Sequence, residues 1–491
     1  MNTCTKAGAV LALTLVGAGC SDFLQGPGLT ENPNNPTTGT PLQQLIAVQA
    51  NMAARLEGQL ARCAGVFTQQ LIGSNNQQLS YCTQYGVTES DISGQMNGFY
   101  IGGGLLSMRA IEAAAESSGD QVLLGITKVW EGLAIGTATS VWGDLPYSEA
   151  VNPDIAEPVL DSQESIYAGV QTRLDEGITA LQAALGGASG NCVPAEGDLI
   201  YCAAAGSRAT EIQRWIRAAY TLKARFHLHL VEQHGNAEYG LALAAALNGI
   251  SEAPTNATQA INGQAPGDFR MFHGSVQDFD ANIWGEFLST RQDLVAGNVL
   301  VQILKARSDP RLAAYFDANA QGQFMGADQN DSTIRAPGCP APPATCAASV
   351  INTTVRRQFT FRQPIVTWAE NQLIMAEAQY MTGDSAGAVA NVDAVRTAVG
   401  MPALGNVSFA DVMTEKYIAM FQNVDVWSDY KRTCIPAVTP FGKPPAPEVL
   451  GRMPYGSAER TSNPHIPLPS AYPAGTTGSS AVRNWNDPNH C

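Results

Sequence analysis

The sequence has few charged residues and lacks the short motifs on which common enzyme classes depend. Only 14% of the 491 residues are charged, well below the usual quarter. HExxH and GxxxxGK[ST] are absent, so a zinc protease or a P-loop nucleotidase has no support. The GxSxG match GDSAG at residues 383–387 lies between two helical runs, whereas an esterase needs this motif at a strand-to-helix turn. No CxxC pair occurs, which argues against a zinc site. We therefore expect no catalytic residue, no metal and no cofactor.

Positive charge is especially scarce. The formal net charge is −15 and no run of Lys or Arg occurs. Such a surface repels phosphate backbones, so the composition argues against nucleic acid as a partner. Asn, Gln, Ser, Thr and Gly are plentiful, and the hydrophobic share of 45% is enough for a core. Together these favour a globular protein whose surface makes neutral hydrogen bonds, as secreted and sugar-handling proteins do.

No apolar run is long enough to cross a bilayer, but a short one lies at the N-terminus. Residues 1–19 combine Lys6, an apolar stretch and three small residues, which is the form of a signal peptide. Cys20 follows directly and is the expected lipid acceptor of a bacterial lipoprotein. An ordinary secretion signal is the alternative. Residues 20–41, rich in Pro, Asn and Gly, predict an extended tether, and residues 42–491 a single domain.

The other cysteines outside the signal peptide are even in number, which is typical of an oxidising compartment. Sequential pairing is the simplest of the possible connectivities. The predicted disulfide cysteines are Cys63, Cys82, Cys192, Cys202, Cys339, Cys346, Cys434 and Cys491.

Helical periodicity dominates the chain, and alternating strand patterns are scarce. Helices are expected over residues 42–71, 105–116, 122–141 and 161–185, the last with a capping-box spacing from Asp161 to Glu164. Around Gly383, two helical runs carry small residues at Ala376 and Ala388, as a tetratricopeptide-like hairpin requires where its helices cross. The turn at residues 118–120 predicts a second hairpin. The fold class is therefore all-α with little β-structure.

Three loop-rich tracts interrupt the helices, at residues 74–100, 263–291 and 323–361. Loops of this length inside a compact protein are usually functional or disordered. The first two hold aromatic residues beside amides, which favours function. Tryptophans within helical periodicity are instead assigned to the core: Trp130, Trp142, Trp215, Trp368 and Trp427.

Six blocks of sequence, in order, resemble the SusD/RagB family. They are "ENPNNPT", "WGDLPYSEAV" with "PVLDSQESIY" over residues 142–167, "SDPRLAAYF" at 308–316, "WAENQLIMAEAQYMTGD" at 368–384, "EKYIAMFQNVDVWSDYKRT" at 415–433 and "RMPYGSAERTSNPHIP" from 452. The resemblance covers nearly the whole mature chain.

The resemblance implies a lipid-anchored, surface-exposed protein of the outer membrane. Its fold would be all-α, with four tetratricopeptide-like hairpins on one side and a loop-rich ligand region on the other. Family members capture glycans or other oligomeric nutrients, cap a SusC-like TonB-dependent transporter and are not enzymes. We assign the motif residues Asp309, Pro310, Arg311 and Glu377 to the fold, as a helix break, a buried ion pair or a cap.

A sugar ring offers an apolar face to aromatic side chains and a rim of hydroxyls to polar ones. Within the first two tracts, and in places that correspond to the family's ligand segments, the predicted ligand-binding residues are Tyr81, Tyr85, Asn97, Tyr100, Asn282 and Trp284. Three alternatives stay open: a peptide receptor, a protein-interaction scaffold, and a glycoside hydrolase with a carboxylate pair drawn from Asp91, Asp278 and Glu286.

Overall fold

The computed structural model describes residues 39–192, 197–330, 347–442, 448–467, 483–488 and 491. In this part the chain is mostly helical, which confirms the predicted all-α class. The helices are α2 (Pro41–Leu56), α3 (Gln59–Phe67), the π-helix η1 (Gln78–Thr83), α4 (Glu89–Asn97), α5 (Leu105–Ser118), α6 (Gln121–Trp142), α7 (Gln163–Leu185), α8 (Cys202–Ala205), α9 (Arg208–Leu228), α10 (Val231–His234), α11 (Asn236–Ala246), α12 (Ala257–Asn262), α13 (Ile283–Thr290), α14 (Asn298–Ala306), α15 (Arg311–Tyr315), α17 (Trp368–Met381), α18 (Ser385–Ala398), α19 (Phe409–Ala419), α20 (Val426–Thr433) and α21 (Ser457–Ser462).

The strands of the described part form three antiparallel pairs that fasten loop segments to one another. These pairs are β1 (Leu71–Gly73) with β3 (Leu294–Ala296), β2 (Phe269–Arg270) with β6 (Pro364–Val366), and β4 (Phe316–Asp317) with β5 (Val350–Ile351). Within the described residues, no helix has both the length and the hydropathy that spanning a membrane requires.

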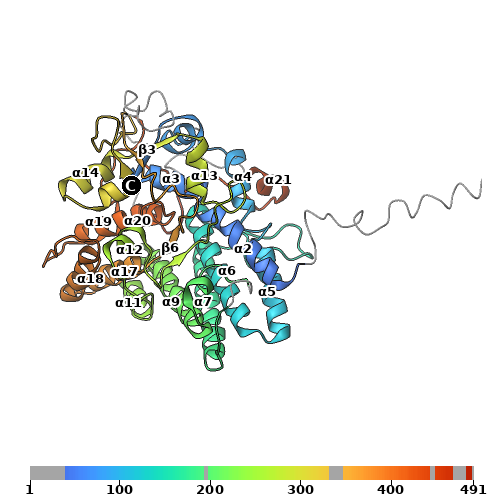
Figure 1. Ribbon diagram of the computed structural model, residues 1–491. Coiled ribbons are helices and arrows are strands. Elements are labelled where there is room, and N and C mark those ends of the chain that lie inside the picture. Colours follow the sequence, from blue (N-terminus) through green and yellow to red (C-terminus); the bar gives the residue numbers. More distant parts are fainter. Residues whose placement is uncertain (1–38, 193–196, 331–346, 443–447, 468–482, 489–490) are drawn as a thin grey trace, which may run out of the picture.

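Helical hairpins make up one side of the molecule. Helices α5, α6, α7 and α9 pack on one another in that order, and α9 continues through α11 to α17 and α18 (Figure 1). Both predicted hairpins are present: α5 and α6 join at Gly119, which has a left-handed φ of 75°, and α17 and α18 join at Gly383. Ala376 and Ala388 are fully buried. Strand β3 and helices α3, α13 and α14 lie at the opposite end in Figure 1.

Helix α6 is the centre of this stack, with every side chain from Leu123 to Trp142 buried. It approaches its neighbours closely because glycines stand at the contacts. A Cβ on Gly125 would lie 2.5 Å from Leu181 of α7, and one on Gly136 would lie 2.3 Å from the Phe226 ring of α9. All five tryptophans assigned to the core are buried, as predicted: Trp130, Trp142, Trp215, Trp368 and Trp427.

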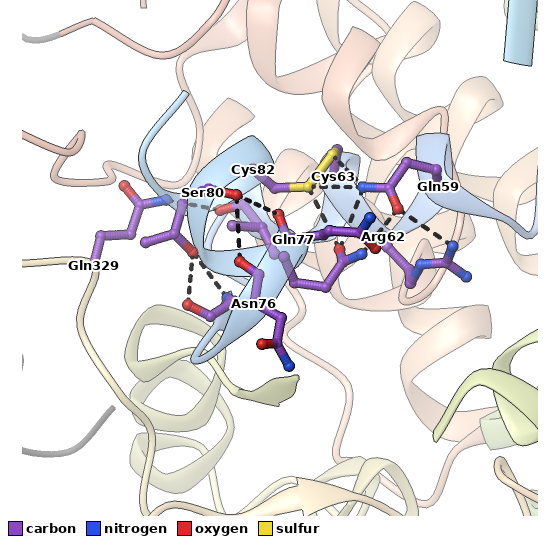
Figure 2. The surroundings of a disulfide bond; sticks show 12 residues. Gln59, Arg62, Cys63, Asn76, Gln77, Ser80, Cys82 and Gln329 are labelled. Carbon is purple, nitrogen blue, oxygen red and sulfur yellow. Dashed lines mark hydrogen bonds between the residues drawn. A yellow bond between two sulfur atoms is a disulfide. The ribbon is translucent and has the colours of Figure 1, made fainter. Parts of the chain in front are cut away.

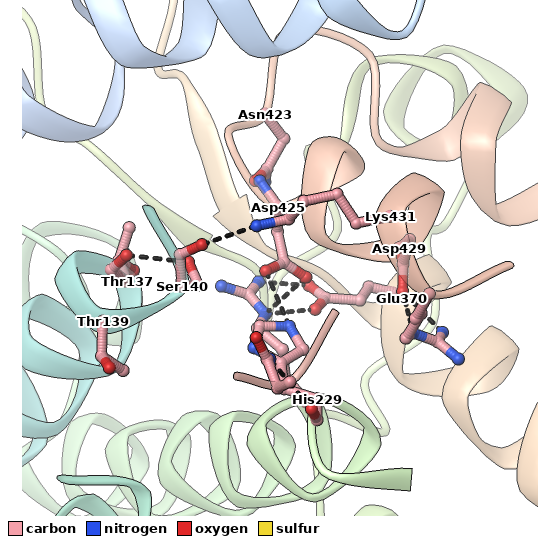
Figure 3. Close-up of polar contacts among 12 residues, drawn as sticks. Thr137, Thr139, Ser140, His229, Glu370, Asn423, Asp425, Asp429 and Lys431 are labelled. Carbon is pink, nitrogen blue, oxygen red and sulfur yellow. Dashed lines mark hydrogen bonds and ion pairs between the residues drawn. The ribbon is translucent and has the colours of Figure 1, made fainter. Parts of the chain in front are cut away.

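Buried charges between the hairpins pair with opposite charges (Figure 3). The Arg225 guanidinium donates to both oxygens of Glu370, at 2.6 and 2.7 Å, and its Nε lies 3.6 Å from Asp425. Burial alone would raise the pKa of Asp425, but the charges of His229 and Arg225 outweigh this and hold the pKa below its ordinary value. Lys431 differs, because its ammonium has no carboxylate in ion-pair contact within the described residues and donates to the Ser140 carbonyl at 2.8 Å.

The residues of the family blocks that were assigned to the fold have the predicted structural roles. Arg311 forms a bidentate ion pair with Asp309, at 2.9 and 2.6 Å, and also donates to Glu415 at 2.8 Å. Glu377 is fully buried and pairs with Arg432. Pro310 stands at the N-cap of α15.

Some local predictions were wrong. The helix expected over residues 42–71 is two helices, α2 and α3, followed by β1. The chain bends at Gly58, and this bend requires glycine because a Cβ there would lie 2.2 Å from the Ala54 carbonyl oxygen. Helix α7 is capped by Ser162 and not by an Asp161–Glu164 box, since the Asp161 carboxylate accepts instead from the Tyr147 and Ser148 amides.

Three of the predicted disulfides are present: Cys63–Cys82, Cys192–Cys202 and Cys434–Cys491. The sequential pairing is therefore confirmed for these six cysteines. Cys339, Cys346, the lipidation candidate Cys20 and most of the predicted tether lie outside the described residues, while Pro41, assigned to the tether, begins α2.

Candidate ligand-binding site

The structure brings together the first two loop-rich tracts. Strand β1 leads into the first tract and pairs with β3, which follows the second. Beyond this ladder, the Ser74 amide donates to the Asp293 carbonyl at 2.8 Å, and the Arg291 guanidinium donates to the Gln77 amide oxygen at 3.0 Å. We call residues 74–91 and 271–291, which thus lie side by side, the crest.

The crest is more regular than the sequence suggested. Its first segment contains η1 and the start of α4, where the Thr88 and Asp91 side chains form a capping box. A disulfide holds η1 to α3: the Gln59 amide nitrogen lies 3.2 Å from the sulfurs of Cys63 and of Cys82 (Figure 2). A polar surface held by a disulfide and a strand ladder is pre-organised for binding.

The second segment of the crest lies over the junction of α2 and α3. The His273 ring is 2.9 Å from the Glu57 carboxylate at this junction, and both side chains are buried. Burial alone would lower the pKa of His273, but Glu57 raises it overall. Nearer α13, the Arg62 guanidinium of α3 lies 4.0 Å from the centre of the Phe287 ring.

Two of the predicted ligand residues are in the interior. Trp284 and Asn282 are completely buried. Asn282 caps α13 by accepting from the Gly285 amide, and donates to the Phe361 carbonyl at 2.9 Å. Neither side chain has surface to offer a ligand in this structure, because the segment that the sequence presents as an open loop folds here into a helix with a buried face.

The other four predicted residues are only partly buried, and they do not form one surface cluster. The Tyr85 hydroxyl lies 3.2 Å from Gln329 and accepts from the Phe441 amide, and burial raises its pKa to about 12. The Tyr100 hydroxyl is buried, and Asn97 ends α4. Tyr81 alone belongs to a surface network.

This network runs across both segments of the crest. The Tyr81 hydroxyl lies near Asp91 and Gln77, and the interaction with Asp91 raises the pKa of Tyr81. Gln77 in turn accepts from Arg291, whose guanidinium carbon lies 5.9 Å from the centre of the Phe287 ring. Gln77 and Arg291 are exposed and the two rings are half-buried. The network therefore offers amide, hydroxyl, carboxylate and guanidinium groups beside aromatic surface.

An apolar cavity of about 250 Å³ opens beside the second segment of the crest. Its rim holds Phe272, which is 43% exposed, and Phe279, which is 92% exposed. The rest of the lining comes from Ile46, Gln49, Ala50, Ala53, Leu199, Ile200, Met271, His273, Asp280, Ala281 and Ile283. Exposed phenyl rings beside an apolar hollow suit the C–H face of a sugar ring or another apolar group.

Phe279, Arg62 and Arg291 were not predicted from the sequence. Two of them carried a signal: Phe279 stands between two aspartates in a segment without periodicity, and Arg62 is the one charge in the apolar run "QLARCAGVF". Sequence alone could not show which of many loop aromatics point outward.

The acids considered for a hydrolase do not face each other across a gap. Glu286 is hydrogen-bonded directly to Asp278, which together with burial raises its pKa, while Asp91 caps α4. Carboxyl groups in direct contact leave no space for the several-ångström separation that a glycosidase needs. A further group in the described residues, Cys192, Cys202 and Glu211, resembles a metal site only in spacing, because its cysteines form a disulfide.

Comparison with known proteins decides the family. The SusD-like family described as "Starch-binding associating with outer membrane" matches residues 33–455. The chain belongs to this family. Its members are carbohydrate-binding proteins and not enzymes, in agreement with the prediction from sequence.

Solved structures show the same fold. A chitin-binding SusD homologue from Flavobacterium johnsoniae superposes with a TM-score of 0.70 at 18% identity, covering 91% of this chain and 98% of that one. A SusD-like protein from Bacteroides thetaiotaomicron gives a TM-score of 0.70 at 16% identity over 91% and 99%. Another structure, named a chitin-binding protein, gives 0.68 at 20% over 92% and 100%. Among curated proteins, no match to the SusD-like chain was found.

Proposed function

We propose that this SusD-like protein is a lipid-anchored receptor of the bacterial cell surface that captures an oligosaccharide at the crest and delivers it to a TonB-dependent transporter. The observation that carries the proposal is the surface of the crest itself. The exposed rings of Phe272 and Phe279 border an apolar cavity, and the network of Gln77, Tyr81 and Arg291 supplies hydrogen-bonding groups. A sugar needs both kinds of partner.

Family membership and the chitin-binding structural neighbours support a glycan over a peptide as the ligand. The test is a screen of the purified full chain against a glycan array and a peptide library. Binding of glycans and not peptides is expected. Selective binding of peptides, or of neither class, would overturn the proposal.

Substitution of Phe279 tests where the ligand binds. Loss of one exposed stacking ring should weaken glycan affinity roughly tenfold, and Phe279→Ala should leave the unfolding free energy nearly unchanged because the ring is 92% exposed. Trp284→Ala is the matched control. Its ring is fully buried, so it should cost roughly 3–5 kcal/mol of stability. An unchanged affinity in Phe279→Ala would place the ligand elsewhere.

The anchor and the transporter are tested separately. Wild-type cells fed labelled palmitate should incorporate label into the chain, and Cys20→Ala should not. A wild-type chain without label would contradict lipidation. Delivery requires that the chain co-purify from native outer membranes with a TonB-dependent barrel and that deleting the barrel abolish glycan uptake. Normal uptake after deletion would contradict it.

A further inference from the structure

Arg62, beneath the crest, is a buried cation with little to compensate its charge. Arg62 is 8% exposed, and its one side-chain hydrogen bond within the described residues is a 3.3 Å contact from Nη2 to the Gln59 amide oxygen, which also accepts from Gln78. Its Nε is buried without an acceptor in the described chain. Burial, together with the charge of Arg291, lowers the pKa of Arg62 to about 9, while Asp293 opposes the shift.

Other buried cations without a carboxylate in ion-pair contact are better satisfied. The Arg356 guanidinium donates to Gln422 at 3.1 Å and to the Ile261 carbonyl at 3.0 Å, and it lies against three aromatic rings. The Lys431 ammonium donates to the carbonyls of Ser140 and Gly451. A structural role accounts for these two cations, but it leaves most of the Arg62 donors unused.

A second guanidinium approaches the same place. Arg62 and Arg291 both lie against the Phe287 ring, and Arg291 is exposed, with a neutral amide, Gln77, as its hydrogen-bond acceptor. Asp293 is the nearby carboxylate that acts on Arg62, and its Oδ1 accepts from the Asn76 amide instead. In a chain of net charge −15, two neighbouring arginines without ion-pair partners in the described residues form a local positive site.

We infer that Arg62 and Arg291 bind an anionic group of the ligand at the edge of Phe287, so that the captured glycan is acidic and carries a carboxylate or a sulfate. This inference depends on the proposed function and makes its ligand class more specific. Guanidinium groups bind both anions through paired N–H donors. The anion would supply the acceptors that Arg62 lacks, while Gln77 and Tyr81 remain available to hydroxyl groups.

The first test measures affinity for two matched pairs of probes by calorimetry on the full chain: tetragalacturonate with its methyl ester, and cellotetraose 6-sulfate with cellotetraose. We expect the charged member of one pair to bind at least about tenfold more tightly. Arg291→Gln and Arg62→Met should abolish that preference, and Arg217→Gln, a partly exposed arginine on α9, should keep it. The pair that shows the effect distinguishes carboxylate from sulfate.

Binding of uncharged members as tightly as charged ones, or a preference that survives in Arg291→Gln, would overturn the inference and leave the proposed function intact. Arg291 is exposed, so this variant remains informative if Arg62→Met fails to fold.

A second measurement does not depend on glycans. Inorganic sulfate, compared with chloride at equal ionic strength, should raise the melting temperature of the wild type more than that of Arg291→Gln, because an anion that binds the folded state stabilises it. An equal rise in both proteins would overturn the anion site even if a glycan binds. If sulfate raises the melting temperature of the wild type more than that of Arg291→Gln, but no glycan binds, the result would support the anion site and contradict the proposed function.

Discussion

In the helical hairpins, the buried Arg225 lies between the carboxylates of Glu370 and Asp425, whereas beneath the crest the buried Arg62 has no ion pair within the described residues and donates to the amide of Gln59. The two regions also differ in their aromatics: Trp130 of α6 is fully buried, while Phe279 is almost fully exposed. A buried ion pair that is satisfied within the chain serves the fold. Donors and rings left without partners in the chain are available to a ligand.

The largest effect should come from breaking a hairpin ion pair. Arg225→Met leaves Glu370 and Asp425 buried without their cation, which should cost about 3–5 kcal/mol in urea unfolding. Arg62→Met is the matched control and should cost about 1 kcal/mol or less, because Arg62 forms no ion pair within the described residues that the substitution could break. Similar losses in both variants would mean that the two arginines have the same role.

Removing a disulfide should separate stability from binding. The Cys63→Ala/Cys82→Ala double variant opens a loop of 19 residues and should lose about 3 kcal/mol. It should also weaken glycan binding, because η1 carries Tyr81. Opening the 57-residue loop at Cys434 and Cys491 should cost about 4 kcal/mol with unchanged affinity. If both double variants lose glycan affinity to the same extent, the Cys63–Cys82 disulfide has no specific role in holding the crest for binding.

Acid should weaken the hairpins through Asp425. Its folded pKa is depressed, so its contribution to stability is present above the unfolded value and is lost as the pH falls toward the folded one. Asp425→Asn lacks this contribution, so the gap in unfolding free energy between wild type and variant should narrow by roughly 2 kcal/mol from pH 7 to pH 2.5. A gap that stays constant with pH would show that the charge of Asp425 is not what stabilises the hairpins.

The smallest effect concerns two tyrosine hydroxyls. Tyr81→Phe removes a surface hydroxyl that lies near Asp91 and Gln77, and should reduce glycan affinity about two- to threefold with stability unchanged within about 0.5 kcal/mol. Tyr85→Phe removes the bond to Gln329 and should cost about 1 kcal/mol of stability with affinity unchanged. The opposite pattern would exchange the roles of the two residues.

The sequence was most informative where periodicity and small residues define packing. The hairpins around Gly119 and Gly383, the buried tryptophans and three disulfides follow from local patterns. The site was predictable only as two tracts, because the exposure of a loop aromatic depends on contacts far away in sequence. Trp284 and Phe279 are close neighbours in the chain, yet the Phe359 and Phe361 carbonyls anchor Asn282 and so direct Trp284 inward. No local pattern contains that information.

The attachment of the crest has a consequence for how specificity can change. The crest is held by one disulfide and one short strand ladder, whereas α6 is packed so tightly that added atoms at Gly125 or Gly136 would collide with its neighbours. Substitutions at residues such as Gln77, Phe279 and Arg291 can therefore accumulate without disturbing the scaffold. Evolution or protein engineering could therefore change the ligand of such a receptor by substituting a few surface residues.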